Sequence, residues 1–327
     1  AWVVCFGIWY GARAAATISG SGIGTATAFT DLWHRLPVIL QYLGKILLPV
    51  NLSVFPTQQD TVLWYGIVAA VALVAVITLS RKGNVKAIGA GIVCFFLFLM
   101  PALLVPDELN RQTFEHRLYL PLMGLLLVLP QTILLPQVSD AKKLVTVWVG
   151  ICVVFAGLNY NHQQNFNDPF AFWSQAAETS PNSAYANMML AARLDKSEVQ
   201  RSEAMFRKAY QLNPKEKYLN FYMAEVLQRK DSVLASEPYL LAEKQISDYI
   251  KCDFYMARVQ MEKGDRMGAI ASLERYLIRD KYDAPAHNNL LLLLLDAGQT
   301  EKARAHIAAM KQMGMAVHPA IMARAGM

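Results

Sequence analysis

The chain has 327 residues, of which 54% are hydrophobic and only 17% are charged. Soluble domains carry about 25% charged residues, so this composition disfavours a wholly soluble protein. The net charge of +6 is modest and no basic stripe carries interleaved aromatic residues, which argues against nucleic-acid binding. The four cysteines show neither a disulfide pattern nor the spacing of metal ligands. Apolar runs dominate up to about residue 160, and charged residues are frequent afterwards.

Residues 1–160 are therefore predicted to form a multi-span membrane domain. A spanning helix needs about 20 mainly apolar residues. Whole or partial spans are expected near residues 1–12, 62–80, 87–106, 118–138 and 144–160. The first of these starts inside an apolar run, which indicates the C-terminal part of a longer protein. The span near 118–138 contains three prolines, which membrane helices tolerate when neighbouring groups satisfy the freed carbonyls.

The segment 31–57 is apolar but does not read as a simple span. It carries His34, Arg35 and Lys45 and is interrupted by three prolines. Because a charge in the middle of a bilayer is costly, we expect an interfacial or re-entrant helix here, with Lys45 extended towards the headgroups. The alternative is that these three side chains surround the same pocket as residues 115–119.

The short loops between spans predict the orientation of the chain. Loops 81–86 and 139–143 hold more basic than acidic residues, whereas loop 107–117 holds three acids and two arginines. Cytoplasmic loops are enriched in Lys and Arg, so the first two loops are assigned to the cytoplasm. Loop 107–117 and everything after residue 160 are then extracytoplasmic, which in a bacterium means the periplasm.

Residues 161–327 show an internal period of about 34 residues. The motifs "FWSQAAETSPNSAY" and "MFRKAYQLNPKEKY" place Pro181 and Pro214 33 residues apart, and Ala269 and Ala303 are 34 apart. This period, with a Gly turn between helices and Pro closing a unit, is typical of tetratricopeptide (TPR) repeats. We predict about four stacked units, so the fold class is all-α: a polytopic membrane domain followed by a TPR α-solenoid.

Large side chains of the repeat region are expected to pack in the array rather than to bind a ligand. Aromatic residues at helical spacing fill the space between neighbouring repeat units. This expectation applies to Trp173, Phe206 and Tyr276. The apolar stretch 288–298 is predicted to be a helix buried on both sides, because it is too short for a membrane span.

Three motifs together resemble the transmembrane-and-TPR-containing (TMTC) glycosyltransferases and their bacterial relatives. These motifs are "LGKILLPVNLSVFP", "EHRLYLPLMG" and the junction "NHQQNFNDPFAFWSQAAETSPNSAYANMML". The resemblance implies an enzyme of the GT-C class, which moves a sugar from a polyprenyl-phosphate donor to an extracytoplasmic protein or glycan. The TPR array would position the acceptor, and no cofactor beyond the donor lipid is implied. Leu122 stands where the family often has Ser, and His116 separates the acid from the arginine.

The family's acidic catalytic residues lie in a loop that nothing in this sequence matches. The catalytic residues therefore stay unknown and enzymatic activity stays open. Two other readings remain: a non-catalytic, membrane-anchored TPR scaffold for envelope proteins, and a transporter or lipid ligase that also binds a lipid phosphate. The expected partners are membrane lipids and a protein or glycan acceptor, and the expected location is a bacterial inner membrane.

The segment Glu115 to Tyr119, here called the lip, holds the candidate lipid-phosphate-binding residues. Arg117 suits a phosphate because a guanidinium stays charged and bonds two oxygens at once. A protonated His116 would add a second donor. Glu115 would orient Arg117 or accept a sugar hydroxyl, and the Tyr119 hydroxyl would reach the same phosphate. A fixed cation here would stabilise the leaving phosphate. The alternative role is a solvated anchor that sets the depth of a membrane helix.

Overall fold

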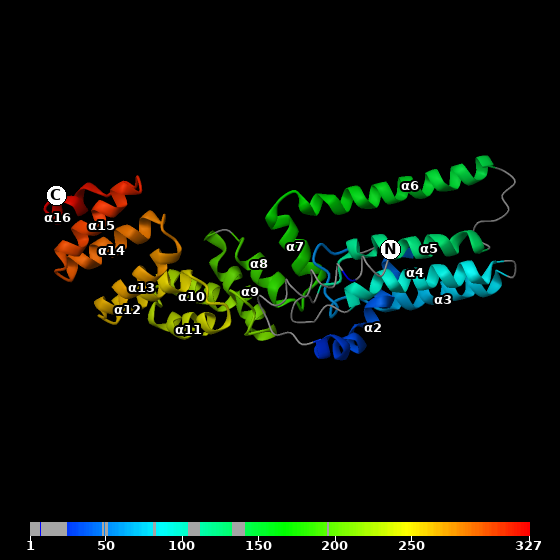
Figure 1. The fold of residues 1–327 in the computed structure, drawn as a ribbon, viewed down its shortest axis with the longest axis horizontal. Coiled ribbons are helices and arrows are strands. Elements are labelled where there is room, and N and C mark those ends of the chain that lie inside the picture. Colours follow the sequence, from blue (N-terminus) through cyan, green and yellow to red (C-terminus); the bar gives the residue numbers. More distant parts are fainter. Residues whose placement is uncertain are drawn as a thin grey trace. The chain divides into compact units, whose positions relative to one another are not determined.

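The computed structural model describes Gly7 and residues 25–47, 49, 52–80, 83–103, 112–132, 141–194 and 196–327. Over these residues the predicted all-α class is confirmed, because the described elements are helices. The described extended backbone pairs at one antiparallel bridge, between Thr57 and Gln112. The chain divides into two compact units, Ala1–Ser180 and Pro181–Met327, whose helices are labelled in Figure 1.

The described part of the first unit contains six α-helices. They are α2 (Thr25–Leu47), α3 (Trp64–Leu79), α4 (Val85–Leu103), α5 (Tyr119–Val128), α6 (Ala141–Gln163) and α7 (Pro169–Thr179), with a 3-10 turn at Glu115–Leu118 before α5. Helix α2 contacts α3 and α4, and α4 contacts α5. Their core comprises Val38, Tyr42, Phe95, Leu99, Leu103 and Leu118. This core places the end of α2 beside the start of α5.

The described helices agree only in part with the predicted spans. Val85–Leu103 and Val145–Phe166 are long and apolar enough to cross a membrane by length and composition. Helix α3 has 16 residues and α5 has ten, so both are shorter than predicted. Helix α5 gives way to a 3-10 turn at Leu129–Gln131 that contains Pro130, where the missing N–H ends the α-helical ladder. Most of the predicted span near 1–12 lies outside the described residues. So do residues 133–138, the end of the predicted span near 118–138.

The segment 31–57 also differs from its prediction. Helix α2 starts earlier, at Thr25, and continues through Pro37 to Leu47. Beyond it, the described residues from Leu52 to Leu63 form no helix. Burial of Val38 and Tyr42 compensates for the backbone hydrogen bond that Pro37 removes. The proline therefore does not break the helix.

Glycines permit two close helix crossings in this unit. A Cβ added at Gly44 would lie 2.8 Å from the backbone nitrogen of Gly66, and one added at Gly66 would overlap the Leu40 carbonyl. A Cβ at Gly91 would lie 2.6 Å from the Gly124 oxygen, so α4 and α5 approach backbone to backbone. Small residues at a crossing allow this distance, as in many membrane helix pairs.

The second unit is a series of antiparallel helix pairs. Its helices are α8 (Ala184–Ala191), α9 (Val199–Leu212), α10 (Leu219–Arg229), α11 (Glu237–Ile246), α12 (Lys251–Glu262), α13 (Arg266–Arg279), α14 (Ala284–Asp296), α15 (Thr300–Gln312) and α16 (Pro319–Arg324). The contacts pair α8 with α9, α10 with α11, α12 with α13 and α14 with α15. The predicted Gly turns are present at Gly264 and Gly298, whose φ angles of 78° and 71° favour glycine.

Each helix pair carries one buried polar residue at an equivalent position. These residues are Asn187, Asn220, Asp253 and His287, all at most 5% exposed. Asn187 donates to the carbonyl of Pro181 and Asn220 to that of Pro214, each six residues earlier and each at 3.0 Å. His287 Nε2 lies 3.0 Å from the carbonyl of Lys281, again six residues earlier. In these three helix pairs, the buried side chain thus holds the first helix of the pair on the turn that precedes it.

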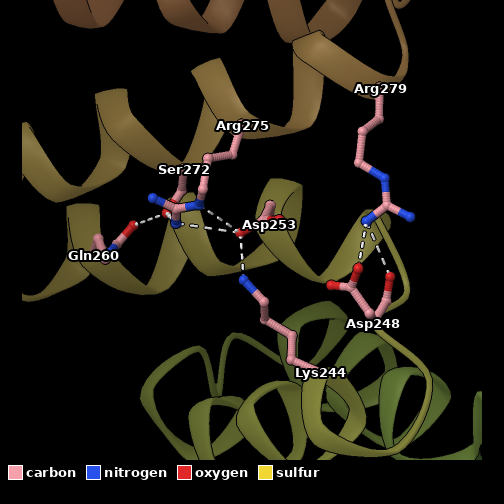
Figure 2. Close-up of polar contacts among 7 residues, drawn as sticks. All are labelled: Lys244, Asp248, Asp253, Gln260, Ser272, Arg275 and Arg279. Atoms are coloured by element: carbon pink, nitrogen blue, oxygen red, sulfur yellow. Dashed lines mark hydrogen bonds and ion pairs between the residues drawn. The ribbon is translucent and has the colours of Figure 1, made fainter.

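Asp253 departs from this pattern because an ionised carboxylate cannot donate a hydrogen bond. It accepts instead from Lys244 Nζ at 2.8 Å and from Arg275 Nε at 3.2 Å. Arg275 also donates to Ser272, which donates to Gln260 at 2.7 Å (Figure 2). The carboxylate therefore joins α11, α12 and α13 through a polar network.

A histidine pair joins α14 to α15. His287 Nδ1 lies 2.8 Å from His306 Nε2. Since a carbonyl only accepts, His287 must carry its proton on Nε2, facing Lys281. Its Nδ1 is then an acceptor, and His306 donates to it from Nε2. Burial, and secondarily the proximity of His287, lowers the pKa of His306.

We predict that this helix pair loosens as the pH falls below the pKa of an unfolded histidine, near 6.5. A folded-state pKa that lies below the unfolded value means that protonation favours the unfolded form. Stability is therefore complete above that pH and is lost as the pH falls through the folded pKa. The protection factors of amides in α14 and α15, which correct for the intrinsic pH dependence of exchange, should fall between pH 7 and pH 5. His306→Gln keeps a donor without a titrating group and should flatten that dependence; an unchanged pH profile would refute the assignment.

Aromatic residues expected in the array divide between the two units. Phe206 and Tyr276 are 3% and 2% exposed and belong to its buried core, as predicted. Trp173 does not: its ring centroid lies 5.5 Å from that of Phe55, within the first unit. In the stretch 288–298, the predicted buried helix is α14, with Leu290, Leu291, Leu293 and Leu294 in the core.

Candidate functional site

The lip lies where the chain enters α5. Phe114 is extended and is followed by the 3-10 turn Glu115–Leu118. Leu118 points into the core at 6% exposure, so the polar residues before it are displayed at the helix end. His116 is exposed and stacks on Phe114, with ring centroids 5.3 Å apart. Tyr119 is 76% exposed.

The guanidinium of Arg117 is held by neutral groups. Its Nη1 donates to the Gln112 carbonyl at 3.1 Å, and its central carbon lies 5.8 Å from the Phe114 ring centroid. The Tyr42 hydroxyl lies close enough to interact electrostatically with it. Among the described residues, no carboxylate lies within ion-pair distance of Arg117. Within that described part of the chain the half-buried charge has no counter-charge, and a cation in this position favours an anion.

Glu115 does not orient Arg117; it pairs with Lys45 of α2 instead. The Lys45 side chain is only 12% exposed, so it is paired rather than extended towards solvent or headgroups. The expectation that Lys45 extends towards the headgroups is therefore wrong. Its pairing with Glu115 favours the alternative, in which charged residues of α2 lie beside residues 115–119. His162, near the end of α6, interacts electrostatically with both partners.

Arg35 and Arg117 both line a cavity of about 10 Å³. Arg35 is 5% exposed and donates to the Ala102 carbonyl at 3.3 Å. Thr113 also lines this cavity, and its buried hydroxyl has no hydrogen-bond partner among the described residues. His34, by contrast, is exposed and does not line the cavity. Two arginines from different helices thus line one small cavity.

Lys45 lines a second cavity, of about 50 Å³. Its wall includes Gln41, Ser53, Asp60 and Thr179. Gln41 is 2% exposed; its amide nitrogen donates to the Gln58 carbonyl at 3.1 Å, whereas its oxygen has no partner among the described residues. A hydroxyl or a water molecule would satisfy that acceptor.

The structure therefore places Lys45 beside Glu115 and Tyr42 beside Arg117, and the motif alone indicated neither neighbour. His116 and Tyr119 lie beside them at the surface. Tyr42 and Gln41 were missed by sequence reasoning. A helical signal for Tyr42 was present: Arg35, Val38, Tyr42 and Lys45 recur at intervals of three and four, which places them on one face of α2.

The described residues contain no cluster of three or more potential metal ligands. Cys252 is buried in the array, and burial is the main cause that raises the pKa of its thiol to about 12. A thiol with this pKa is protonated at neutral pH and is a poor nucleophile.

Comparison with known proteins gives structural similarities only. No protein-family model and no curated protein matches the chain. MamA (residues 41 to the end) from Desulfovibrio magneticus RS-1 is 13% identical, with a TM-score of 0.41 over 47% of this chain and 90% of that one. A MamA RS-1 double mutant gives 14% identity and the same TM-score over 47% and 89%. YrrB, described as a TPR protein with an unusual peptide-binding site, is 17% identical with a TM-score of 0.39 over 43% and 73%. Solved structures similar to this chain thus include a TPR protein.

Proposed function

We propose that this chain acts in a membrane protein that transfers a sugar from a polyprenyl-phosphate donor to an extracytoplasmic acceptor. In this proposal the lip binds the carrier phosphate, and the helical repeats of the second unit hold a protein or glycan acceptor. Helices α4 and α6 would span a bacterial inner membrane, and the repeats would lie in the periplasm. The resemblance of the lip and junction motifs to the TMTC glycosyltransferases supplies the reaction class.

The observation that carries this proposal is the guanidinium of Arg117, which has no carboxylate partner among the residues that the structure describes. The guanidinium lies against a carbonyl, an aromatic ring and a phenol, which position it without neutralising it. Arg35 lines the same cavity. A lipid phosphate would bring the opposite charge and two oxygens that match the guanidinium fork. As charge develops on the departing phosphate, this fixed cation would stabilise it.

We predict that Arg117→Ala weakens binding of a polyprenyl phosphate by about 10–100-fold, the range expected for losing a charge-assisted hydrogen bond. Arg117→Lys keeps the charge but loses the paired geometry, so an intermediate affinity is expected. The measurement is titration of the full chain in lipid nanodiscs with a polyprenyl phosphate. Binding should also weaken as salt is added.

Lys86→Ala is the matched control for this titration. Lys86 lies at the first turn of α4, whereas Arg35 bonds the carbonyl of Ala102 near its end. The variant removes one cation about 24 Å along the helix from the lip. It should bind like the original chain. Equal losses in both variants would indicate a general charge effect, and no loss with Arg117→Ala would contradict the phosphate role.

A non-catalytic scaffold is the second candidate, because the helix pairs of the second unit form a repeat array that offers an extended surface. A scaffold would bind a protein partner equally well with and without Arg117. Absence of polyprenyl-phosphate binding by the original chain, together with retained partner binding, would favour this reading over sugar transfer.

A further inference from the structure

Helix α7 is joined to a backbone segment far away in the sequence by a side-chain clamp. The Gln175 amide oxygen accepts from the backbone N–H of Val54 at 2.9 Å, and its amide nitrogen donates to the Leu52 carbonyl, also at 2.9 Å. Both hydrogen-bonding functions of one glutamine are therefore used on two backbone groups of the same segment. A side chain in this arrangement fixes both the position and the direction of the segment.

Three further contacts continue the clamp. Ser53 Oγ and Thr179 Oγ1 lie 2.6 Å apart, and Ser180 Oγ donates to the Phe55 carbonyl at 2.7 Å. The ring of Trp173 packs against that of Phe55. Ser53, Phe55 and Ser180 are at most 8% exposed, so water does not readily replace these hydrogen bonds. The chain at residues 52–55 is thus held on α7 at each successive residue.

The clamped segment in turn holds the backbone that precedes the lip. The Thr113 N–H donates to the Pro56 carbonyl at 2.9 Å, beside the bridge between Thr57 and Gln112. The rings of Phe55 and Phe114 meet edge to face, with centroids 6.2 Å apart. Residues 55–57 and 112–114 therefore form one short, buried pairing.

That pairing ends on Arg117. Gln112 supplies the carbonyl that accepts from the guanidinium, and Phe114 supplies the ring beside it. The contacts run without interruption from Gln175 through residues 52–57 and 112–114 to the cation of the lip. Each step is a hydrogen bond or ring contact between described residues.

We propose that Gln175 is a positioning residue for Arg117, so that α7 sets the geometry of the phosphate-binding lip. The inference rests on the proposed function where it concerns phosphate affinity, whereas the physical coupling can be measured without it. Helix α7 is the last helix before the repeat array in the sequence. In this proposal it also positions the arginine of the lip.

The first test measures the coupling by amide hydrogen exchange of the full chain in nanodiscs. Gln175→Ala should accelerate exchange in residues 112–118, although none of them contacts Gln175 directly. Gln175→Glu keeps the acceptor for Val54 and should give a smaller effect. The matched control is Glu178→Ala, since Glu178 is exposed on the same helix and does not contact the clamped segment. Unchanged exchange at 112–118 in Gln175→Ala would overturn the proposal.

The second test is a double-mutant cycle on polyprenyl-phosphate affinity. Gln175→Ala alone should weaken binding about three- to ten-fold, comparable to one net hydrogen bond. In an Arg117→Ala background the same change should have no further effect, because it acts through that guanidinium. Additive losses would overturn the positioning role. If Arg117→Ala leaves affinity unchanged, the proposed function fails, and the exchange experiment still decides whether the coupling exists.

Discussion

Gly91→Ala is expected to destabilise the packing of α4 on α5 by about 1–3 kcal/mol, the usual cost of overpacking a close contact. An added Cβ would lie 2.6 Å from the Gly124 carbonyl oxygen and 2.7 Å from a methyl of Val128. The first of these neighbours is backbone on a facing helix, so the helices must separate to admit even one methyl group. Thermal unfolding of the full chain in detergent, followed by circular dichroism, measures the loss.

Gly89→Ala provides a control two residues earlier on the same helix. Gly89 is exposed, and a Cβ built there meets no atom within 4 Å. Alanine favours a helix over glycine by up to about 1 kcal/mol, so this variant should be neutral or slightly more stable. The two substitutions have the same chemistry and opposite expected signs. Equal melting temperatures for both variants would show that the crossing does not limit stability.

The fold was predictable where local pattern and tertiary packing agree. The repeat region follows a 34-residue period because each helix pair needs its neighbours to bury its apolar face. The glycine crossings were not predictable, because a Gly in an apolar run does not indicate which helix faces it. The length of α2 was also missed. Pro37 indicated a break, and burial of Val38 and Tyr42 outweighed it.

The candidate site was predictable in part for a related reason. The charged lip stood out because ionisable groups beside an apolar run are costly. Its partners come from 70 and 82 residues away, since Lys45 pairs with Glu115 and Arg35 shares a cavity with Arg117. The role of Gln175 was invisible in the sequence, because its bonds go to backbone groups that carry no residue identity.

Asp253→Ala is expected to destabilise the array by about 1–3 kcal/mol, less than the 3–5 kcal/mol typical of breaking a fully buried ion pair. The carboxylate is buried at 5% exposure, but Arg275 is 51% exposed and can regain water when its partner is lost. Lys244, at 30% exposure, would be the more strongly affected cation. Urea unfolding of the full chain, with hydrogen exchange of α11 to α13 as the local probe, measures this loss.

Asp253→Asn separates the contribution of charge from that of the repeated hydrogen bond. An asparagine at this position reproduces Asn187 and Asn220 of the first two helix pairs, whose amides donate to the carbonyl six residues earlier. At position 253 that carbonyl belongs to Ser247, and the amide oxygen can still accept from Lys244. We therefore expect Asp253→Asn to retain more stability than Asp253→Ala. If the two variants unfold at the same urea concentration, the charge rather than the repeated polar contact holds α12 in place.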